Sequence, residues 1–221
     1  MTVFDRNIPE SSGHPEYASE YHHGDYFDDE AGSFATQIDR QTSDDIDSEF
    51  IGRTDKVVVY RISAKRSDNY IFGFGPEYEG ANPLHLLHKQ EAIIFVGRIT
   101  QFEGQHLRHV VKPNGLPFAS VYLPLVRKEF LRQGIAVSIY KMLTHHYNIV
   151  ASNEQSKQAS FMWKEKLNHV VNHMYSISDN PITFDEVTGD DSKYRSHMIS
   201  HSDAERHHFV ATSKPLERKN A

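Results

Sequence analysis

The hydrophobic positions of the chain follow a strand-like pattern up to about residue 126. Short runs rich in β-branched and aromatic residues are bounded there by polar residues or glycine, which is typical of β-strands. Strands are therefore expected over residues 56–62, 69–74, 91–102, 106–111 and 118–126, and a short helix over 84–89. The third and fourth runs predict a hairpin through a turn at 103–105. The fifth run is almost entirely apolar and predicts a central strand.

From residue 131 the spacing of apolar positions becomes helical. Ile135, Ile139, Met142 and Leu143 recur at intervals of three and four residues, which predicts an amphipathic helix over 131–147.

Alternating elements continue to the end of the chain. A short buried strand is expected over 148–152, and Ser152 with Gln155 fits a capping box that begins a second helix over 153–168. Two further strands are expected over 174–178 and 207–212, separated by a polar loop, 179–203. The pattern as a whole predicts an α/β (α+β) fold with a mixed central sheet and flanking helices.

The first 50 residues differ in composition from the rest. They hold 13 acidic residues and two arginines, a net charge of −11, whereas the whole chain carries −6, so the remainder carries +5. No sustained hydrophobic period is evident in this segment. Residues 1–50 are therefore predicted to be an acidic flexible tail, and residues 51–221 a single folded domain. The tail would either dock a basic partner or be inert.

Composition limits the possible chemistry. The chain has no cysteine, which excludes disulfides, thiolate metal sites and a cysteine nucleophile. No apolar run approaches the roughly 18 residues of a membrane span, and no signal-peptide pattern is present, so a cytoplasmic protein without membrane partners is expected. Some of the 15 histidines are spaced three or four apart, namely His85 with His88, His169 with His173 and His197 with His201. Without a His-Glu-x-x-His motif, we expect no metal.

The junction between the strand 118–126 and the following helix is the strongest candidate site. Free N–H groups at a helix start attract anions, and Gly134 lets a phosphate approach the backbone closely. Arg127, Lys128 and Arg132 add positive charge around the same turn. The segment is neither a nucleoside-triphosphate P-loop nor the three-glycine dinucleotide fingerprint. On spacing alone, an ordinary strand-to-helix turn is the alternative to a pyrophosphate site.

Residues 126–136 resemble motif A of the GNAT N-acetyltransferase superfamily, which runs Val-x-Pro-Glu-Tyr/Phe-Arg-x-x-Gly-Ile-Gly/Ala into a helix. The positions that match in register are Val126, Glu129, Phe130, Gly134, Ile135 and Ala136. Residues 149–167 are similar to motif B, especially to the Ser-Asx-x-x-Gln-Ser…Trp-Lys-x-x-Leu variant of phage-encoded members. The resemblance implies a GNAT-like sheet and, with the phage-like variant, a location in the host cytoplasm.

The resemblance also implies a function and a set of binding residues. The chain would be an acyltransferase that uses acetyl-CoA as co-substrate and acetylates a primary amine of a protein, a small molecule or a nucleobase by direct transfer. Leu125 and Val126 would hold the pantetheine arm. The diphosphate would bind to the turn formed by Arg132, Gln133, Gly134, Ile135 and Ala136. Ser156 and Trp163 in the motif B segment complete the implied cofactor site.

Two positions depart from the family pattern. The family arginine that opens the pyrophosphate loop falls on Leu131. The tyrosine that often protonates the leaving thiolate falls on Trp163, whose indole N–H is not an acid at neutral pH. Trp163 is therefore either a core residue or a neighbour of the acyl group.

Transfer to an amine also requires a proton acceptor, because a protonated ammonium group has no lone pair with which to attack the thioester. The strand 118–126 contains no carboxylate. The candidate catalytic residues are therefore His106 and Glu103 of the expected hairpin, together with Tyr122 on the strand itself. Each of these residues has an alternative interpretation as an ordinary exposed side chain.

Two other functions are consistent with the sequence. A catalytically inactive GNAT-fold protein that binds or sequesters a host protein or nucleic acid is favoured by the two departures and the missing carboxylate. A nucleic-acid-binding module is the third hypothesis, based on the +5 charge of residues 51–221 and on Arg61, Lys65 and Arg66.

Overall fold

The structure is a computed structural model of the chain. It describes residues 23–39, 45–64, 69–102, 105–151, 162–163, 165–179, 182–187 and 207–219.

Within these residues the chain forms a nine-stranded sheet with the strand order β1-β2-β3-β4-β6-β7-β10-β8-β9. The strands are β1 (Ile46–Arg53), β2 (Val58–Ala64), β3 (Asn69–Phe74), β4 (Ile93–Gln101), β6 (Phe118–Val126), β7 (Asn148–Val150), β8 (His173–Asp179), β9 (Ile182–Glu186) and β10 (His207–Thr212). Strands β6 and β7 are parallel, and every other neighbouring pair is antiparallel. A separate antiparallel pair joins β5 (Val111–Lys112) to β11 (Glu217–Arg218).

The helices are α1 (His23–Asp39), α2 (Pro83–Leu86), α3 (Gln105–Val110) and α4 (Ile135–Leu143). Short 3-10 turns cover Pro76–Tyr78, Gln90–Ala92, Lys128–Phe130 and Leu167–His169. The predicted mixed sheet with flanking helices is confirmed.

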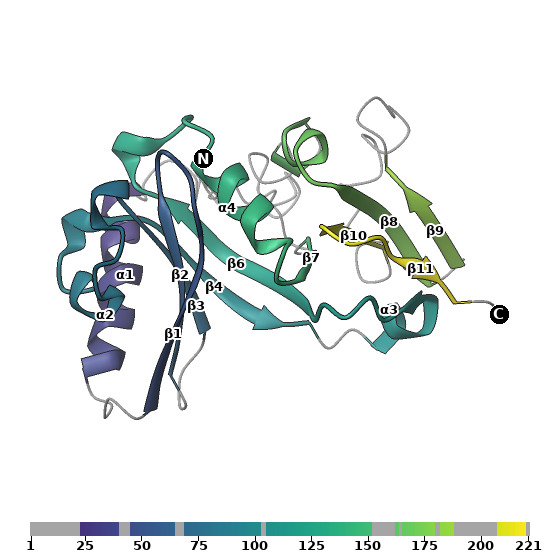
Figure 1. Cartoon of the computed structure of the whole chain (residues 1–221), viewed down its shortest axis with the longest axis horizontal. Coiled ribbons are helices and arrows are strands. Elements are labelled where there is room, and N and C mark those ends of the chain that lie inside the picture. The colour runs from purple at the N-terminus through teal and green to yellow at the C-terminus, as the bar shows by residue number, and fades with distance from the viewer. Residues whose placement is uncertain are drawn as a thin grey trace, which may run out of the picture.

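Helices cover both faces of the sheet (Figure 1). Apolar residues of α1 and α2 pack on one face of β2, β3 and β4, while α4 packs on the opposite face. Helix α3 packs with β7, β8 and β10 in a third apolar cluster. The alternation of side chains along each strand divides the core in this way, because successive residues point to opposite faces.

Part of the segment predicted to be an acidic flexible tail is folded. Residues 23–39 form α1, and β1 begins at Ile46, inside the segment assigned to the tail. Phe27, Ala31 and Phe34 are buried at positions i, i+4 and i+7 of α1, which gives the helix an apolar face despite its acidic composition. Residues 1–22 lie outside the described part of the chain.

Three other expectations about secondary structure are wrong. Residues 105–110 form helix α3 rather than the second strand of a hairpin, and β4 pairs instead with β3 and β6. The segment 182–186, assigned to a polar loop, forms strand β9. Helix α4 is shorter than the predicted 131–147: it begins only at Ile135, because Gly134 adopts a left-handed conformation before it, and it ends at Leu143.

The parallel joint between β6 and β7 is stabilised by a reciprocal amide pair. Asn148 is fully buried at the start of β7, and its side-chain amide and that of Asn114 each donate to the other's oxygen, at 2.9 and 3.0 Å. Asn148 also donates to the main-chain oxygen of Leu116 at 2.8 Å. The turn between β5 and β6 is thereby attached to β7.

Asn148→Ala is expected to lower the free energy of unfolding by about 1–3 kcal/mol, because the fully buried Asn148 amide and its hydrogen bonds to Asn114 and to the Leu116 oxygen would be lost. Urea unfolding followed by circular dichroism measures this. Asn69→Ala, at an exposed position of β3, is the control and should change stability by less than about 0.5 kcal/mol. Equal effects of the two substitutions would contradict the structural role of the amide pair.

Candidate functional site

The two parallel strands at the centre of the sheet pair over a short stretch only. Their register runs from Phe118 opposite Asn148 to Ser120 opposite Val150. On its other edge, β6 pairs with β4 as far as Val126. Strand β6 therefore continues well beyond its pairing with β7, and its final residues lead directly to the predicted site.

A β-bulge interrupts β6 within this stretch. The register between β4 and β6 shifts between Val96 and Arg98, so that Gly97 faces both Leu123 and Pro124. Leu123 has a φ of 49°, which is uncommon for a residue with a side chain and costs of the order of 1–3 kcal/mol. Bulges of this kind redirect backbone groups and are frequent beside active sites.

The segment that joins β6 to α4 contains a second unusual backbone feature. Arg132 and Gly134 both have left-handed conformations, with φ of 62° and 79°. A Cβ built on Gly134 would meet no other atom within 4 Å, so that side of the backbone is open. Among the described residues, no side chain caps the start of α4. The N–H groups of its first turn can therefore bind an anion.

Core contacts hold this loop in place. Phe130 and Leu131 are partly buried and pack against the apolar cluster beneath α4. Gln133 donates from its side chain to the main-chain oxygen of Glu129 at 3.1 Å, and Lys56, in the turn between β1 and β2, donates to the main-chain oxygen of Gln133 at 3.0 Å. Leu131 thus anchors the loop to the core.

Arg127 does not contribute charge to the loop as the sequence suggested. Its Nε donates to the main-chain oxygen of Ile93 at 2.7 Å. Its guanidinium group lies 3.6 Å from the carboxylate of Asp28 and 5.0 Å from the centre of the Phe27 ring. These contacts attach α1 to the end of β6, so the arginine has a structural role. Lys128 and Arg132 are exposed at the loop.

The residues predicted to bind the co-substrate lie at the end of β6, in the loop and at the start of α4. Leu125 and Val126 end β6, and Ile135 and Ala136 begin α4; all four side chains are buried. Their side chains are therefore part of the core and do not contact a ligand. Gln133 and Arg132 are exposed between them.

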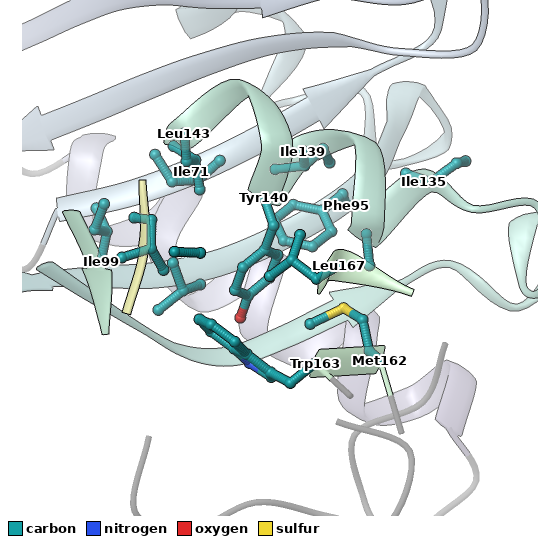
Figure 2. Packing of buried hydrophobic residues seen from close by; sticks show 14 of the residues in the cluster. Ile71, Phe95, Ile99, Ile135, Ile139, Tyr140, Leu143, Met162, Trp163 and Leu167 are labelled. Carbon is teal, nitrogen blue, oxygen red and sulfur yellow. The ribbon is translucent and has the colours of Figure 1, made fainter. Parts of the chain in front are cut away.

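Trp163 lies in the core beneath α4. Its side chain is 2% exposed, and its ring packs edge-to-face against Tyr140, with ring centroids 5.8 Å apart. Figure 2 shows the Tyr140 hydroxyl directed at the Trp163 ring, beside Met162 and Leu167. Burial raises the pKa of Tyr140 above its ordinary value, so this phenol keeps its proton throughout the neutral range.

The three candidate catalytic residues are not brought together within the described structure. Tyr122, 42% exposed, lies on β6 directly before the bulge. The backbone of His106 belongs to α3, which follows the end of β4 and packs against β8, at the opposite end of β6 from the loop (Figure 1). Glu103 and Ser156 lie outside the described residues.

Of the three histidine pairs, His197 with His201 lies outside the described residues. Within the described residues, no group of three or more His, Asp or Glu side chains is placed to hold a metal ion. His173 begins β8 and lies 2.8 Å from the Glu186 carboxylate of β9. This contact between His173 and Glu186 therefore links β8 to β9.

Comparison with protein-family models, curated proteins and solved structures finds no match to this chain. None of the helices in the described segments has the length and apolar character needed to cross a membrane.

Proposed function

We propose that the chain is an acetyl-CoA-dependent N-acetyltransferase of the GNAT type, which moves an acetyl group to a primary amine by direct transfer. The observation that carries the proposal is the junction between β6 and α4. Strand β6 is bulged there and extends beyond its pairing with the parallel strand β7. It leads through a loop with two left-handed residues into α4, whose start has no side-chain cap.

The loop fits a phosphate-bearing co-substrate. The open side of Gly134 allows close approach of a diphosphate, and the buried side chains of Ile135 and Ala136 leave main-chain N–H groups as the binding groups. Exposed Lys128 and Arg132 add positive charge. Leu125 and Val126 would hold the pantetheine arm through their backbone. Bound acetyl-CoA supplies the acetyl group as a thioester.

The amine must lose its proton before it can attack the thioester. Tyr122 lies beside the bulge, and we propose that it orients the acceptor amine there. The backbone of His106 belongs to α3 at the opposite end of β6, so a proton from the amine could reach His106 only through intervening water. A main-chain N–H near the end of β6 would polarise the carbonyl of the thioester.

The first test is thermal unfolding with and without millimolar acetyl-CoA or free CoA. A ligand at about 100 times its Kd adds roughly 2.7 kcal/mol to the stability of the protein, so both ligands should raise Tm clearly. If neither ligand raises Tm, the proposed cofactor site is wrong.

A second candidate function is binding without acetyl transfer. The burial of Trp163 in the core favours it, because the position of the family acid then has no acid and no access to solvent. To distinguish the two functions, the protein is mixed with acetyl-CoA and a panel of amines, and the release of free thiol is measured. Because the chain has no cysteine, a thiol reagent reports CoA alone. If acetyl-CoA binds but neither thiol nor an acetylated product is formed, the result would support the hypothesis of a binding protein without acetyltransferase activity.

A further inference from the structure

A polar strip interrupts the apolar face of the sheet between α1 and α3, which Figure 1 shows at opposite ends of β4 and β6. Val96 and Leu125 belong to the apolar cluster of α1 and α2, whereas Phe102 and Phe118 pack against the cluster of α3. Because every second residue of a strand points to the same face, the residues between these positions lie on that face too. They form the polar strip, which consists of Arg98 opposite Tyr122 and Thr100 opposite Ser120.

Arg98 is the only charged residue of this strip. Its Cα lies opposite Tyr70 of β3 on one side and Tyr122 of β6 on the other. The guanidinium carbon is 5.5 Å from the centre of the Tyr70 ring, and that ring is itself held by Phe34 of α1, with ring centroids 3.7 Å apart. The stem of Arg98 is thus anchored on the α1 side, while Tyr122 on the other side is 42% exposed.

An arginine at this place departs from the pattern of the surrounding strands. Central strands that are covered on both faces are apolar along nearly their whole length, and the rest of β4 between Ile93 and Ile99 follows that rule. Arg98 is half-buried in the middle of this stretch. Departures from the expected pattern concentrate at functional sites, so the strip is a candidate for ligand binding.

The strip adjoins the place where the acetyl group is proposed to lie. The β-bulge of β6 separates Tyr122 from Leu125, whose backbone is proposed to hold the pantetheine arm. Arg98 and Tyr122 are therefore the first side chains on this face beyond the bulge. An acceptor that approaches the thioester along this face meets them both.

The chemistry of the two side chains indicates which acceptor they fit. A guanidinium group presents five N–H donors in a planar fork, which matches a carboxylate through two parallel hydrogen bonds. A phenol beside it can both donate and accept a hydrogen bond. The positive charge of Arg98 also disfavours the protonated form of an amine held nearby, and only the neutral amine can attack the thioester.

We propose that Arg98 and Tyr122 form the acceptor subsite, and that Arg98 selects primary amines that carry a carboxylate over uncharged amines of the same size. This inference rests on the proposed function, because it names the class of acceptor for the same reaction. Arg98 binds the carboxylate through a charge-assisted pair of hydrogen bonds. Tyr122 contacts the amine end of the acceptor, beside the bulge.

The test measures kcat/KM for acetylation of matched pairs of amines by the full chain, with released thiol as the readout. The probes are β-alanine, γ-aminobutyrate and ε-aminocaproate, each paired with its own uncharged carboxamide. The unaltered chain should prefer the carboxylate of at least one pair about tenfold or more, because a hydrogen-bonded charge pair is lost with the amide. The difference should lie mainly in KM, since the carboxylate is bound equally in the ground state and the transition state.

The variants are Arg98→Met, Arg98→Lys and the control Arg108→Met. Methionine keeps an apolar stem against Tyr70, so Arg98→Met should lose the preference while changing kcat/KM for the carboxamides by less than about twofold. Arg98→Lys keeps the charge without the fork and should retain part of the preference. Arg108 is exposed on α3, so its substitution removes the same charge elsewhere and should leave both substrates of a pair unaffected.

The carboxamides separate recognition of the acceptor from a structural effect on the sheet. Equal loss with both members of a pair in Arg98→Met would overturn the subsite and make Arg98 a support of β4. Equal kcat/KM of the unaltered chain for both members of every pair would also overturn it, while the proposed function would stand. If no probe is acetylated, the subsite is overturned, and stabilisation by acetyl-CoA decides separately whether the proposed cofactor site stands.

Discussion

Replacing Gly134 with valine is expected to abolish stabilisation by acetyl-CoA while leaving the protein folded. The new side chain would enter the open space beside the start of α4, where the diphosphate is proposed to bind, and a β-branched residue disfavours the left-handed φ of 79°. A 100-fold rise in Kd would reduce the stabilisation at a fixed ligand concentration from about 2.7 to about 0.4 kcal/mol. Thermal unfolding with and without the ligand measures both the fold and the binding.

The matched control is Gly80→Val. Gly80 has the same φ of 79°, and a Cβ there also meets no atom within 4 Å, but it lies in the segment between β3 and β4. The two variants therefore bear a similar backbone strain, and only the first should lose ligand binding. If Gly134→Val still shows the full shift with acetyl-CoA, the diphosphate does not bind at this turn.

Much of the central sheet could be predicted from local sequence. Strands β2, β3, β4 and β6 are rich in β-branched and aromatic residues, and burial on both faces keeps those runs nearly continuous. The junction between a strand and a helix was likewise predictable, although the predicted helix began at residue 131 and α4 begins at Ile135, after the left-handed Gly134. The functional interpretation came from resemblance, which the comparisons leave untested.

The wrong secondary-structure predictions arose where composition or β-propensity was given more weight than the helical spacing of apolar residues. The many carboxylates of residues 23–39 suggested a tail, although Phe27, Ala31 and Phe34 carry a helical period. In α3, Leu107 and Val110 are three apart and both buried, a spacing that fits a helix turn as well as a strand. Because residues 105–110 form a helix, β4 pairs with β6 instead of with the segment that directly follows it. That pairing joins distant parts of the chain, and no local sequence pattern indicates it.

The contact of Lys56 with the loop before α4 was missed for a different reason. It joins Lys56 to Gln133, 77 positions apart, and nothing in the local sequence of the β1–β2 turn indicates which loop the lysine reaches. Contacts of this kind depend on strand order, which brings the edge hairpin to the start of α4. Contiguous binding residues can thus be predicted from a motif, whereas a side chain contributed by another element requires the fold.

Trp163→Ala is expected to lower the free energy of unfolding by about 3–5 kcal/mol, because it removes a large, fully packed side chain from beneath α4. The loss is a substantial part of the roughly 5–15 kcal/mol that stabilises a typical domain. Trp163 is the only tryptophan of the chain, so its removal also eliminates the intrinsic tryptophan fluorescence. Urea unfolding should therefore be followed by far-ultraviolet circular dichroism in all variants.

Trp163→Phe is the matched variant, because it keeps an aromatic ring against Tyr140 and should cost clearly less than the alanine substitution. A cost below about 1 kcal/mol for Trp163→Ala would contradict the core assignment and favour a position facing the acyl group.

Fluorescence of the unaltered protein tests independently whether Trp163 lies in the core or faces the acyl group. A buried Trp163 that only supports α4 should change its emission little when acetyl-CoA binds, whereas a tryptophan in contact with the acyl group should respond strongly. A large stability loss with an unresponsive emission would mean that Trp163 belongs to the core, so that a leaving thiolate would have to obtain its proton from another group.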